Sequence, residues 1–329
     1  MTRLLKFIWI DDNPKRENAA KNLEKLKKVK VFFYDVRNKD LYGELQSIIR
    51  DRNQPDLLLI DDNLDKVTGG LIRKGSTTAE ILRESWPDCP VVCITAVKLD
   101  DISLHRQDIY EEVVEAKNLS DHYGLLLSIA GAFNAIRRKP VRDTSGIIRL
   151  LKAPAIDKDR LVIVMPEVLK AHIKDKSFIM NLSRWVRHTL LCRPGFLYDK
   201  LWAATLLGVK ETSFKKIQKH FIAAKYSGIF ADDRNERWWQ SQLRSIIATL
   251  VADKEETSPW MLGRSLPSIK KRDYSLCYAC NKELPETVAY IDDTPTSSRA
   301  PMHLRCTVAH PKYENSLFYD EIRMMKAAE

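Results

Sequence analysis

The sequence predicts an α/β chain that begins with a doubly wound, five-stranded parallel sheet. A mainly helical region and a small metal-binding tail should follow. In the first third of the 329 residues, apolar runs alternate with amphipathic segments. Positive charge is concentrated in the middle, and paired Cys and His residues lie near the end. A chain of this length can bury more than one core.

Five segments are expected along the chain. The sheet domain takes residues 1–138, and a linker with prolines and a glycine takes 139–158. A basic helical domain, with the element order of a winged helix, takes 159–255. A second linker over 256–272 precedes a zinc-finger-like tail over 273–329.

The strands of the predicted sheet are short runs rich in β-branched and aromatic residues, which is typical of parallel strands buried on both faces. Amphipathic segments between them indicate covering helices, and this alternation predicts a flavodoxin-like strand order. The helix over 14–28 has Asn13 as N-cap and Pro14 at its first position, and Ser120 can cap a helix over 121–138. The strands are expected at 4–10, 29–35, 56–61, 90–95 and 112–116, and the other helices at 39–52 and 77–85.

Polar side chains gather where these strands end, at the edge where doubly wound sheets bind ligands. They comprise four carboxylates, a hydroxyl and an ammonium: Asp11, Asp12, Asp61, Asp62, Thr95 and Lys117. Neighbouring carboxylates repel each other, and a hard divalent cation with oxygen ligands would offset that repulsion. The sequence therefore predicts a Mg²⁺ site that could also neutralise an arriving phosphoryl group.

The motifs IDDNP, LLLIDDNLD, VVCITA and VVEAKN resemble the receiver domain of two-component response regulators, over roughly residues 3–138. The resemblance implies that Asp61 accepts a phosphoryl group and that Asp62 is an extra carboxylate. It implies three further roles: Mg²⁺ is held by Asp11 and Asp12 together with Asp61, a phosphoryl oxygen by Thr95, and the phosphate by Lys117.

Two positions depart from the receiver pattern. Asn118 stands where most receivers have a proline after the lysine, and Val114 stands where most have an aromatic switch residue. The chain thus lacks the aromatic side chain that usually responds to the hydroxyl at Thr95. The alternative is a degenerate receiver that serves only as a docking surface.

Residues 158–272 hold 22 Lys and Arg against 11 Asp and Glu, whereas the whole chain has a net charge of +10. A polyanionic partner should therefore meet this region. Helical periodicity over 165–192 and 197–225, with a turn at Gly208 and a new helix from about Ser213, predicts a helix–turn–helix. The β-like YSGIF stretch that follows would form the hairpin of a winged helix.

Lys215, Lys216 and Lys219 are the candidate contacts to DNA or RNA phosphates. The alternative is a helical protein-interaction module, in which these lysines form a solvated face. Trp238 and Trp239 could belong to a core or to a contact surface.

The tail contains a CxxC, Cys277 and Cys280, followed 22 residues later by an HxxC, His303 and Cys306. Four such ligands suit a tetrahedral, structural Zn²⁺ in a treble-clef or zinc-ribbon type of finger. The metal would supply folding energy that so short a segment lacks. His310 could replace His303, and reduced free thiols are the alternative. The other cysteines are expected in apolar cores: Cys89, Cys93 and Cys192.

These features favour a signalling protein over an enzyme, because no nucleophile elbow or glycine-rich phosphate loop stands out. A histidine kinase or phosphotransfer partner would phosphorylate Asp61, and the basic region and tail would engage DNA, RNA or a protein. The alternative is a non-phosphorylated adaptor in a multi-protein defence or stress assembly. We expect a cytoplasmic protein, because no signal peptide, membrane-spanning run or disulfide framework is evident.

Overall fold

The computed structural model describes residues 3–68, 73–97, 109–175, 177–192, 195–233, 236–252, 258–283, 287–289, 301–309 and 324–326. Its contacts divide the chain into two units. Unit 1 consists of Met1–Ile147 and Pro166–Arg184, and unit 2 consists of Ile148–Met165 and Trp185–Glu329. In these described ranges, no helix is both long and apolar enough to cross a membrane.

Unit 1 is built on the expected parallel sheet. The strand order is β2-β1-β3-β4-β5, and every neighbouring pair is parallel. The prediction of a doubly wound, five-stranded sheet is therefore confirmed. The strands are β1 (Leu5–Asp11), β2 (Val29–Asp35), β3 (Leu57–Asp61), β4 (Val91–Thr95) and β5 (Glu112–Glu115).

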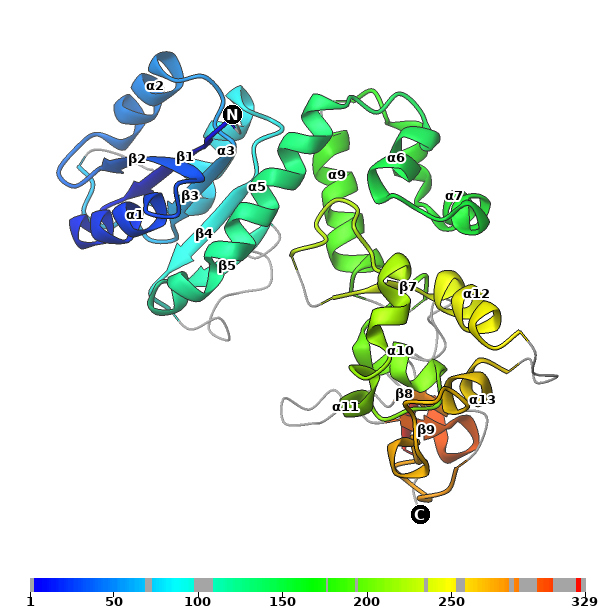
Figure 1. Ribbon diagram of the computed structural model, residues 1–329. Coiled ribbons are helices and arrows are strands. Elements are labelled where there is room, and N and C mark those ends of the chain that lie inside the picture. Colours follow the sequence, from blue (N-terminus) through cyan, green and yellow to red (C-terminus); the bar gives the residue numbers. More distant parts are fainter. Residues whose placement is uncertain are drawn as a thin grey trace. The chain divides into compact units, whose positions relative to one another are not determined.

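Helices cover both faces of this sheet (Figure 1). On one face, α1 (Glu17–Glu24) and α5 (Tyr123–Arg138) lie together, and the Tyr123 hydroxyl donates to the Ala19 carbonyl. On the other face, α2 (Leu41–Asp51) and α3 (Gly75–Ser85) share an apolar core with β1 and β3. Because both faces are covered, β3 and β4 are buried along their whole length.

The helix starts agree with the sequence in one place and differ in another. The Asn13 side chain accepts a hydrogen bond from the Lys15 N–H and begins the 3-10 helix η1 (Pro14–Arg16), which leads into α1. The expected Ser120 cap is wrong. A 3-10 helix, η3 (Ala116–His122), contains this residue, and α5 begins only after it.

Both expected linkers contain helices. The stretch 139–158 includes α6 (Thr144–Leu151), whose Leu151 is fully buried, and the stretch 256–272 includes α13 (Pro259–Arg264). Prolines and glycines marked these stretches as breaks. The apolar side chains between them are nevertheless spaced for a helix, and burial of that face decides the structure.

The remaining elements in the described residues are mostly short helices. They are η4 (Ala155–Asp157), α7 (Lys158–Val164), α8 (Glu167–Ala171), α9 (Phe178–Trp185), the π-helix η5 (Val186–Leu190), β6 (Leu197–Tyr198), α10 (Lys200–Leu206), α11 (Glu211–Phe214), η6 (Gln218–Ala224), β7 (Trp238–Trp239), α12 (Gln240–Leu250), η7 (Lys271–Asp273), β8 (Thr287–Ala289), β9 (Pro301–His303), η8 (Leu304–Cys306), β10 (Thr307–Ala309) and β11 (Met324–Lys326).

Aromatic side chains form the centre of unit 2. The ring of Phe214 packs edge-on against Trp238, with centroids 5.2 Å apart, and stacks on Phe221 at 6.2 Å. Trp238 and Trp239 are only 1% and 2% exposed. These two tryptophans are therefore core residues of unit 2 and not a contact surface.

The expected helix–turn–helix forms only in part, because its second helix is divided between the four-residue α11 and the 3-10 helix η6. The first helix, α10, ends at Leu206, and α11 begins at Glu211 and not at Ser213. In the described part of this region, the YSGIF stretch contains no strand, and β7 pairs with β6. Only the residue before the stretch, Lys225, forms an isolated antiparallel bridge with Trp238. The Ile229 N–H donates to the Leu150 carbonyl at 3.1 Å, which anchors the stretch on α6. The expected hairpin is thus reduced to a single bridge in the described residues.

Gly208 allows the turn between α10 and α11, because its φ is +66° and a Cβ there would lie 2.6 Å from the Trp260 carbonyl oxygen. We expect Gly208→Ala to lower the free energy of unfolding of unit 2 by about 2 kcal/mol or more. Urea unfolding followed by tryptophan fluorescence measures this, because five of the seven tryptophans lie in unit 2.

Gly131→Ala is the matched control for this substitution. Gly131 lies in α5, and a Cβ added to it would meet no described atom within 4 Å. Alanine should therefore be tolerated there, with a gain of about 0.5–1 kcal/mol. An equal free energy of unfolding of unit 2 in the wild type and in Gly208→Ala would contradict this account of the turn.

Candidate functional site

Three aspartates meet at the carboxyl edge of the sheet in unit 1. Ligand oxygens of Asp11, Asp12 and Asp61 all lie within 4.8 Å of one another. The three residues are 0%, 3% and 7% exposed. β1 ends at the first of them and β3 at the last, so the parallel pairing of these strands brings the carboxylates together.

Asp11 is the most enclosed of the three carboxylates. It accepts hydrogen bonds from the Asn13 N–H at 2.8 Å and the Trp9 indole N–H at 3.2 Å. The Arg16 guanidinium lies 3.4 Å away. Burial nevertheless raises the pKa of Asp11 above its ordinary value, because desolvation outweighs the attraction of Arg16.

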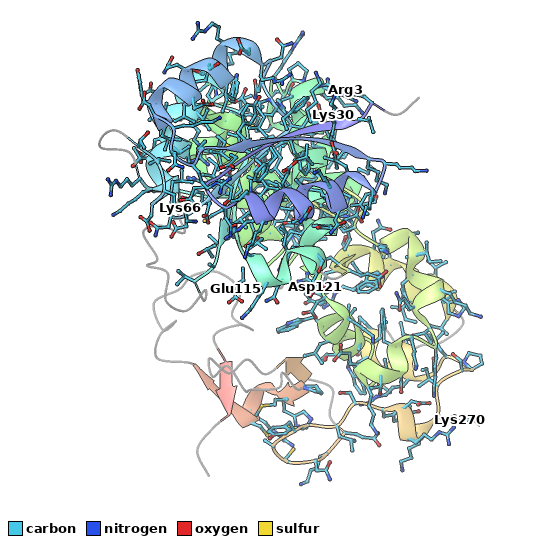
Figure 2. The ribbon with its side chains drawn as sticks, turned by 90° about the vertical axis from the view of Figure 1, so that its left-hand side faces the viewer. Arg3, Lys30, Lys66, Glu115, Asp121 and Lys270 are labelled. Carbon is cyan, nitrogen blue, oxygen red and sulfur yellow. The ribbon has the colours of Figure 1, made fainter. Side chains whose placement is uncertain are left out.

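Asp12 is held by the loop that follows β3. Its carboxylate accepts from the Lys66 backbone N–H at 2.8 Å and contacts the Lys66 ammonium at 3.3 Å. The Lys66 side chain is 59% exposed and lies at the surface of the unit (Figure 2). The two adjacent aspartates therefore have different cationic neighbours.

Asp61 faces the same guanidinium as Asp11, with Arg16 Nη2 3.5 Å from its Oδ1. Burial and the negative charge of Asp11 raise the pKa of Asp61 to about 7, while Arg16 acts in the opposite direction. Like charges in a desolvated pocket are thus only partly neutralised. The cluster has the hard oxygen donors that suit Mg²⁺, and its raised pKa fits a site that gains from added positive charge.

Arg16 was missed by sequence reasoning, which assigned the offset of the carboxylates to a metal alone. It lies at the end of η1, directly after the strand, so this short turn directs it back toward the sheet edge. A basic residue within one turn of a buried acidic pair is the signal that could have found it.

Thr95 and Lys117 are placed differently from each other. Thr95 ends β4, is 1% exposed, and its hydroxyl accepts from the Val97 N–H at 3.0 Å. Lys117 lies in η3, with its side chain 66% exposed and its ammonium 2.8 Å from Glu115. In the described residues its ion pair is therefore with the neighbouring Glu115 and not with the aspartates.

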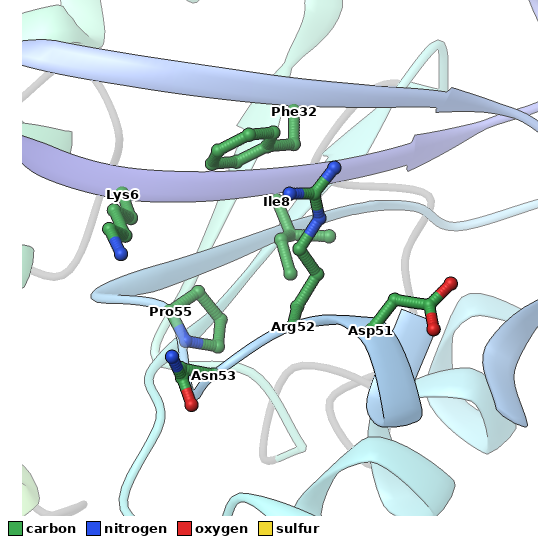
Figure 3. A pocket seen from close by; sticks show the side chains of 7 residues that line it. All are labelled: Lys6, Ile8, Phe32, Asp51, Arg52, Asn53 and Pro55. Carbon is green, nitrogen blue, oxygen red and sulfur yellow. The ribbon is translucent and has the colours of Figure 1, made fainter. Parts of the chain in front are cut away.

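Asp62 and the cavity of Figure 3 lie apart from this arrangement. Asp62 is 5% exposed, and it does not belong to the group of three carboxylates that could share an ion. The cavity, of about 100 Å³, includes Lys6 and Pro55, which precede or begin strands at the amino edge of the sheet. Neither feature extends the carboxylate pocket.

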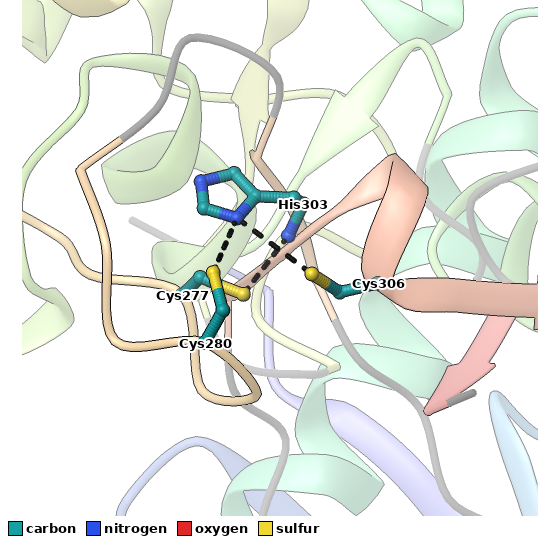
Figure 4. A group of neighbouring side chains, drawn as sticks. All are labelled: Cys277, Cys280, His303 and Cys306. Atoms are coloured by element: carbon teal, nitrogen blue, oxygen red, sulfur yellow. Dashed lines mark hydrogen bonds between the residues drawn. The ribbon is translucent and has the colours of Figure 1, made fainter. Parts of the chain in front are cut away.

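A second group of potential ligands lies in unit 2 and contains all four predicted residues. The ligand atoms of Cys277, Cys280, His303 and Cys306 lie within 4.8 Å of one another. Nδ1 of His303 faces both Cys280 Sγ at 3.2 Å and Cys306 Sγ at 4.0 Å (Figure 4). The arrangement fits a tetrahedral Zn²⁺, with four soft or borderline donors around one point. The spare imidazole of His310 lies outside the described residues.

The turn that contains Cys277 and Cys280, called the cysteine knuckle below, has the local structure that such a site needs. The His303 backbone N–H donates to Cys277 Sγ at 3.4 Å, and the turn closes with the Asn281 N–H on the Cys277 carbonyl at 2.8 Å. Burial acts to raise the pKa of Cys277, but donated backbone hydrogen bonds lower it below its ordinary value. Pairing of β8 with β9 positions His303 against the knuckle.

Arg264 ties this knuckle to the turn between α10 and α11. Its Nε donates to the Gly208 carbonyl at 3.0 Å, and its Nη2 donates to the Ser275 carbonyl at 3.1 Å. Its guanidinium lies 4.9 Å from the ring centre of Trp260 and 4.8 Å from that of Tyr274. The described residues just before the CxxC are therefore held against the helical core of unit 2.

The three candidate nucleic-acid lysines do not act as one free cluster. The Lys216 ammonium lies 2.6 Å from Asp273, which also accepts from the Ser213 hydroxyl at 2.9 Å. The hydrogen bond from Lys216 is the main reason why the pKa of Asp273 is low. All three lysines are exposed, but Lys216 alone has this ion pair with Asp273. Lys216 thus has a structural contact that the sequence did not reveal.

The remaining cysteines divide between core and surface. Cys89 and Cys93 are buried in unit 1, as expected. Cys192 is exposed, and the expectation that it lies in a core is wrong. It lies just after the end of the π-helix η5, and its thiol donates to the Arg187 carbonyl at 3.0 Å.

Comparison with known proteins gives matches of fold only. No family model matches the chain, and no curated protein matches its sequence. The N-terminal part is similar to the CheY-like receiver domain of a response regulator from Methanospirillum hungatei, with 14% identity and a TM-score of 0.30 over 41% of this chain and 98% of that one. A CheY-like receiver domain from Methylobacillus flagellatus gives 16% identity and 0.30 over 39% and 99%.

A response regulator protein from Thermotoga maritima, in complex with Mg²⁺-BeF, gives 16% identity and a TM-score of 0.28 over 36% of this chain and 99% of that one. We do not assign the fold from these low scores. The assignment is based on the strand order β2-β1-β3-β4-β5 and on the parallel pairing of the strands. Unit 1 contains a receiver-like fold.

The raised pKa of Asp61 predicts a pH-dependent stability of this fold. Its protonated form is favoured by folding, so the stabilisation is complete below the ordinary value of 3.8 and is lost as pH rises through about 7. Asp61→Asn removes this loss of stability at high pH, because the amide side chain does not ionise. In the absence of divalent cations, we expect its stability advantage in urea unfolding to be roughly 2 kcal/mol larger at pH 8 than at pH 4.

Asp121→Asn serves as the control, because Asp121 is exposed, lies on η3 and does not belong to the group of three carboxylates. Its effect on stability should be small at both pH values. An Asp61→Asn advantage that does not change between pH 4 and pH 8 would contradict the electrostatic description of the pocket.

Proposed function

We propose that the receiver-like domain is a phosphoacceptor and that Asp61 takes a phosphoryl group from a phosphohistidine of a kinase or phosphotransfer protein. The support is the position of Asp61 in the carboxylate group. Its side chain is 10% exposed, compared with 0% for Asp11 and 4% for Asp12. Of the three carboxylates, Asp61 is therefore the one that a donor can best approach.

In this transfer, a bond forms between an Asp61 carboxylate oxygen and phosphorus while the phosphorus–nitrogen bond of the donor breaks. The released imidazole takes up a proton. Mg²⁺, when held by the three carboxylates, would neutralise charge on the transferred group. Within the chain, Arg16 favours the ionised, nucleophilic form of Asp61, and the buried Thr95 hydroxyl lies at the end of the neighbouring strand.

The output in this proposal is unit 2, whose basic character suits an acidic partner, either a nucleic acid or an acidic protein surface. Lys215, which directly follows α11, and Lys219, on η6, are exposed and are the proposed contacts to that partner. No further catalytic activity is proposed for the chain.

A second candidate function is a pseudo-receiver adaptor that docks without phosphorylation. Two observations favour it. Lys117 is exposed and paired with Glu115, so a receiver's usual phosphate-binding cation is turned away. Val114 is 1% exposed and fills the position of the usual aromatic switch. In this alternative, the sheet of unit 1 is a rigid surface within a larger assembly.

Acid-labile phosphorylation separates these two functions. We expect acetyl phosphate with Mg²⁺ to label the wild-type chain and Asp62→Asn but not Asp61→Asn, because adjacent strand residues face opposite sides. Phosphate-affinity electrophoresis with an acid-treated control measures it. Phosphorylation that persists in Asp61→Asn, or no phosphorylation of the wild type, would contradict phosphoacceptance by Asp61 and favour the adaptor function.

We also propose that the Cys3His group binds one structural Zn²⁺. The supporting geometry is the convergence of Cys277, Cys280, His303 and Cys306 and the backbone N–H donors around Cys277. Four protein ligands leave no open position, which favours a structural over a catalytic role. Binding would stabilise the junction with Gly208, because the Ser275 N–H donates to the Gly208 carbonyl at 3.0 Å.

We expect metal analysis of the purified protein to find about one zinc per chain, and Cys277→Ser to lose it. Limited proteolysis should then cut around the knuckle while unit 1 remains folded, because its sheet has its own core. Cys192→Ser is the matched control, since this exposed cysteine lies outside the group. A zinc-free wild-type protein with a protease-resistant knuckle would refute the proposal.

A further inference from the structure

Arg16 stands between two of the carboxylates that form the potential metal site. Its Nη1 lies 3.4 Å from Asp11 Oδ2, and its Nη2 lies 3.5 Å from Asp61 Oδ1. The side chain is only 12% exposed. The guanidinium thus supplies positive charge at the place where a divalent cation would have to bridge the same two groups.

The attachment of Arg16 is mainly electrostatic. Both distances are longer than the roughly 2.7–2.9 Å of good charge-assisted hydrogen bonds. Nη1 is buried and has no hydrogen-bond partner among the described residues. The backbone of Arg16 is fixed by its N–H bond to the Asn13 carbonyl at 3.0 Å, but the long side chain can rotate out of the pocket. Such a counter-ion can be exchanged without unfolding the turn.

The third carboxylate does not depend on Arg16. Asp12 is paired with Lys66, whose backbone and ammonium both contact it. Arg16 is therefore the cation shared by Asp11 and Asp61 and the one whose departure would leave both available as oxygen ligands to a metal.

We propose that Arg16 is an exchangeable counter-ion that a divalent cation must displace from Asp11 and Asp61 when it binds. This inference rests on the proposed function, because it concerns the metal that the phosphoacceptor pocket would hold. It makes cation binding a competition inside the protein, so the affinity for Mg²⁺ is lower than three aspartates alone would provide.

The test is a titration of the full-length chain with Mg²⁺, followed by the NMR signal of the Trp9 indole N–H. This group donates to Asp11 at 3.2 Å and therefore reports on that carboxylate, and Trp9→Phe assigns the signal. We expect Arg16→Gln to bind Mg²⁺ at least about tenfold more tightly than wild type, because the competing charge is gone. Arg16→Lys, which keeps the charge, should stay near the wild-type midpoint.

Lys15→Gln is the matched control for total charge. Lys15 is the exposed neighbour of Arg16, so its loss removes the same charge without opening the pocket and should change the midpoint less than about twofold. Equal tightening in Lys15→Gln would overturn the inference, as would an unchanged or weaker midpoint in Arg16→Gln. If Arg16→Gln fails to fold, an Arg16→Lys midpoint shifted about tenfold would also overturn it.

These outcomes are distinct from failure of the proposed function. A wild-type chain that shows the predicted Mg²⁺ competition but takes no phosphate on Asp61 would refute phosphoacceptance and leave the counter-ion exchange intact. Conversely, labelling of Asp61 with no tightening in Arg16→Gln would support phosphoacceptance and refute the exchange.

Discussion

Burial of three carboxylates at one edge of a sheet is the constraint on which unit 1 depends. Like charges within 4.8 Å of one another repel strongly in a desolvated pocket, so positive groups must be brought beside them. The chain does this with two loops. The turn capped by Asn13 brings in Arg16, and the loop after β3 brings in Lys66. The segments that follow β1 and β3 thus each supply a positive charge to the carboxylates.

The same constraint explains why a receiver-like pocket here differs from the expected one. Arg16 contacts Asp11 and Asp61 and supplies part of the positive charge that this pocket needs. Lys117 instead pairs with Glu115 in solvent. The cluster remains chemically suited to a hard cation, but its resting state contains its own positive charge. Under the proposed exchange, a divalent cation that enters this pocket displaces Arg16 from two carboxylates and does not fill an empty site.

In unit 2, aromatic packing and one arginine connect the parts of the structure. Phe214 and Trp238 form the centre, and Arg264 lies between the rings of Trp260 and Tyr274 while it donates to carbonyls on either side. Because one of those carbonyls belongs to Gly208, the residues next to the Cys3His group and the turn between α10 and α11 are connected through Arg264. The proposed zinc site would therefore be coupled to the geometry of this turn.

The amino-acid pattern was sufficient to predict the sheet and both ligand groups. Continuous apolar runs bury two faces, and Asp or Cys residues at fixed spacing end up together whenever those strands or turns form. Which charges meet depends instead on the folded chain. Arg16 and Lys66 reach the aspartates, Lys117 does not, and Lys216 is taken by Asp273. The sequence spacing of long charged side chains does not specify their partners. These partners depend on which segments the tertiary structure brings together.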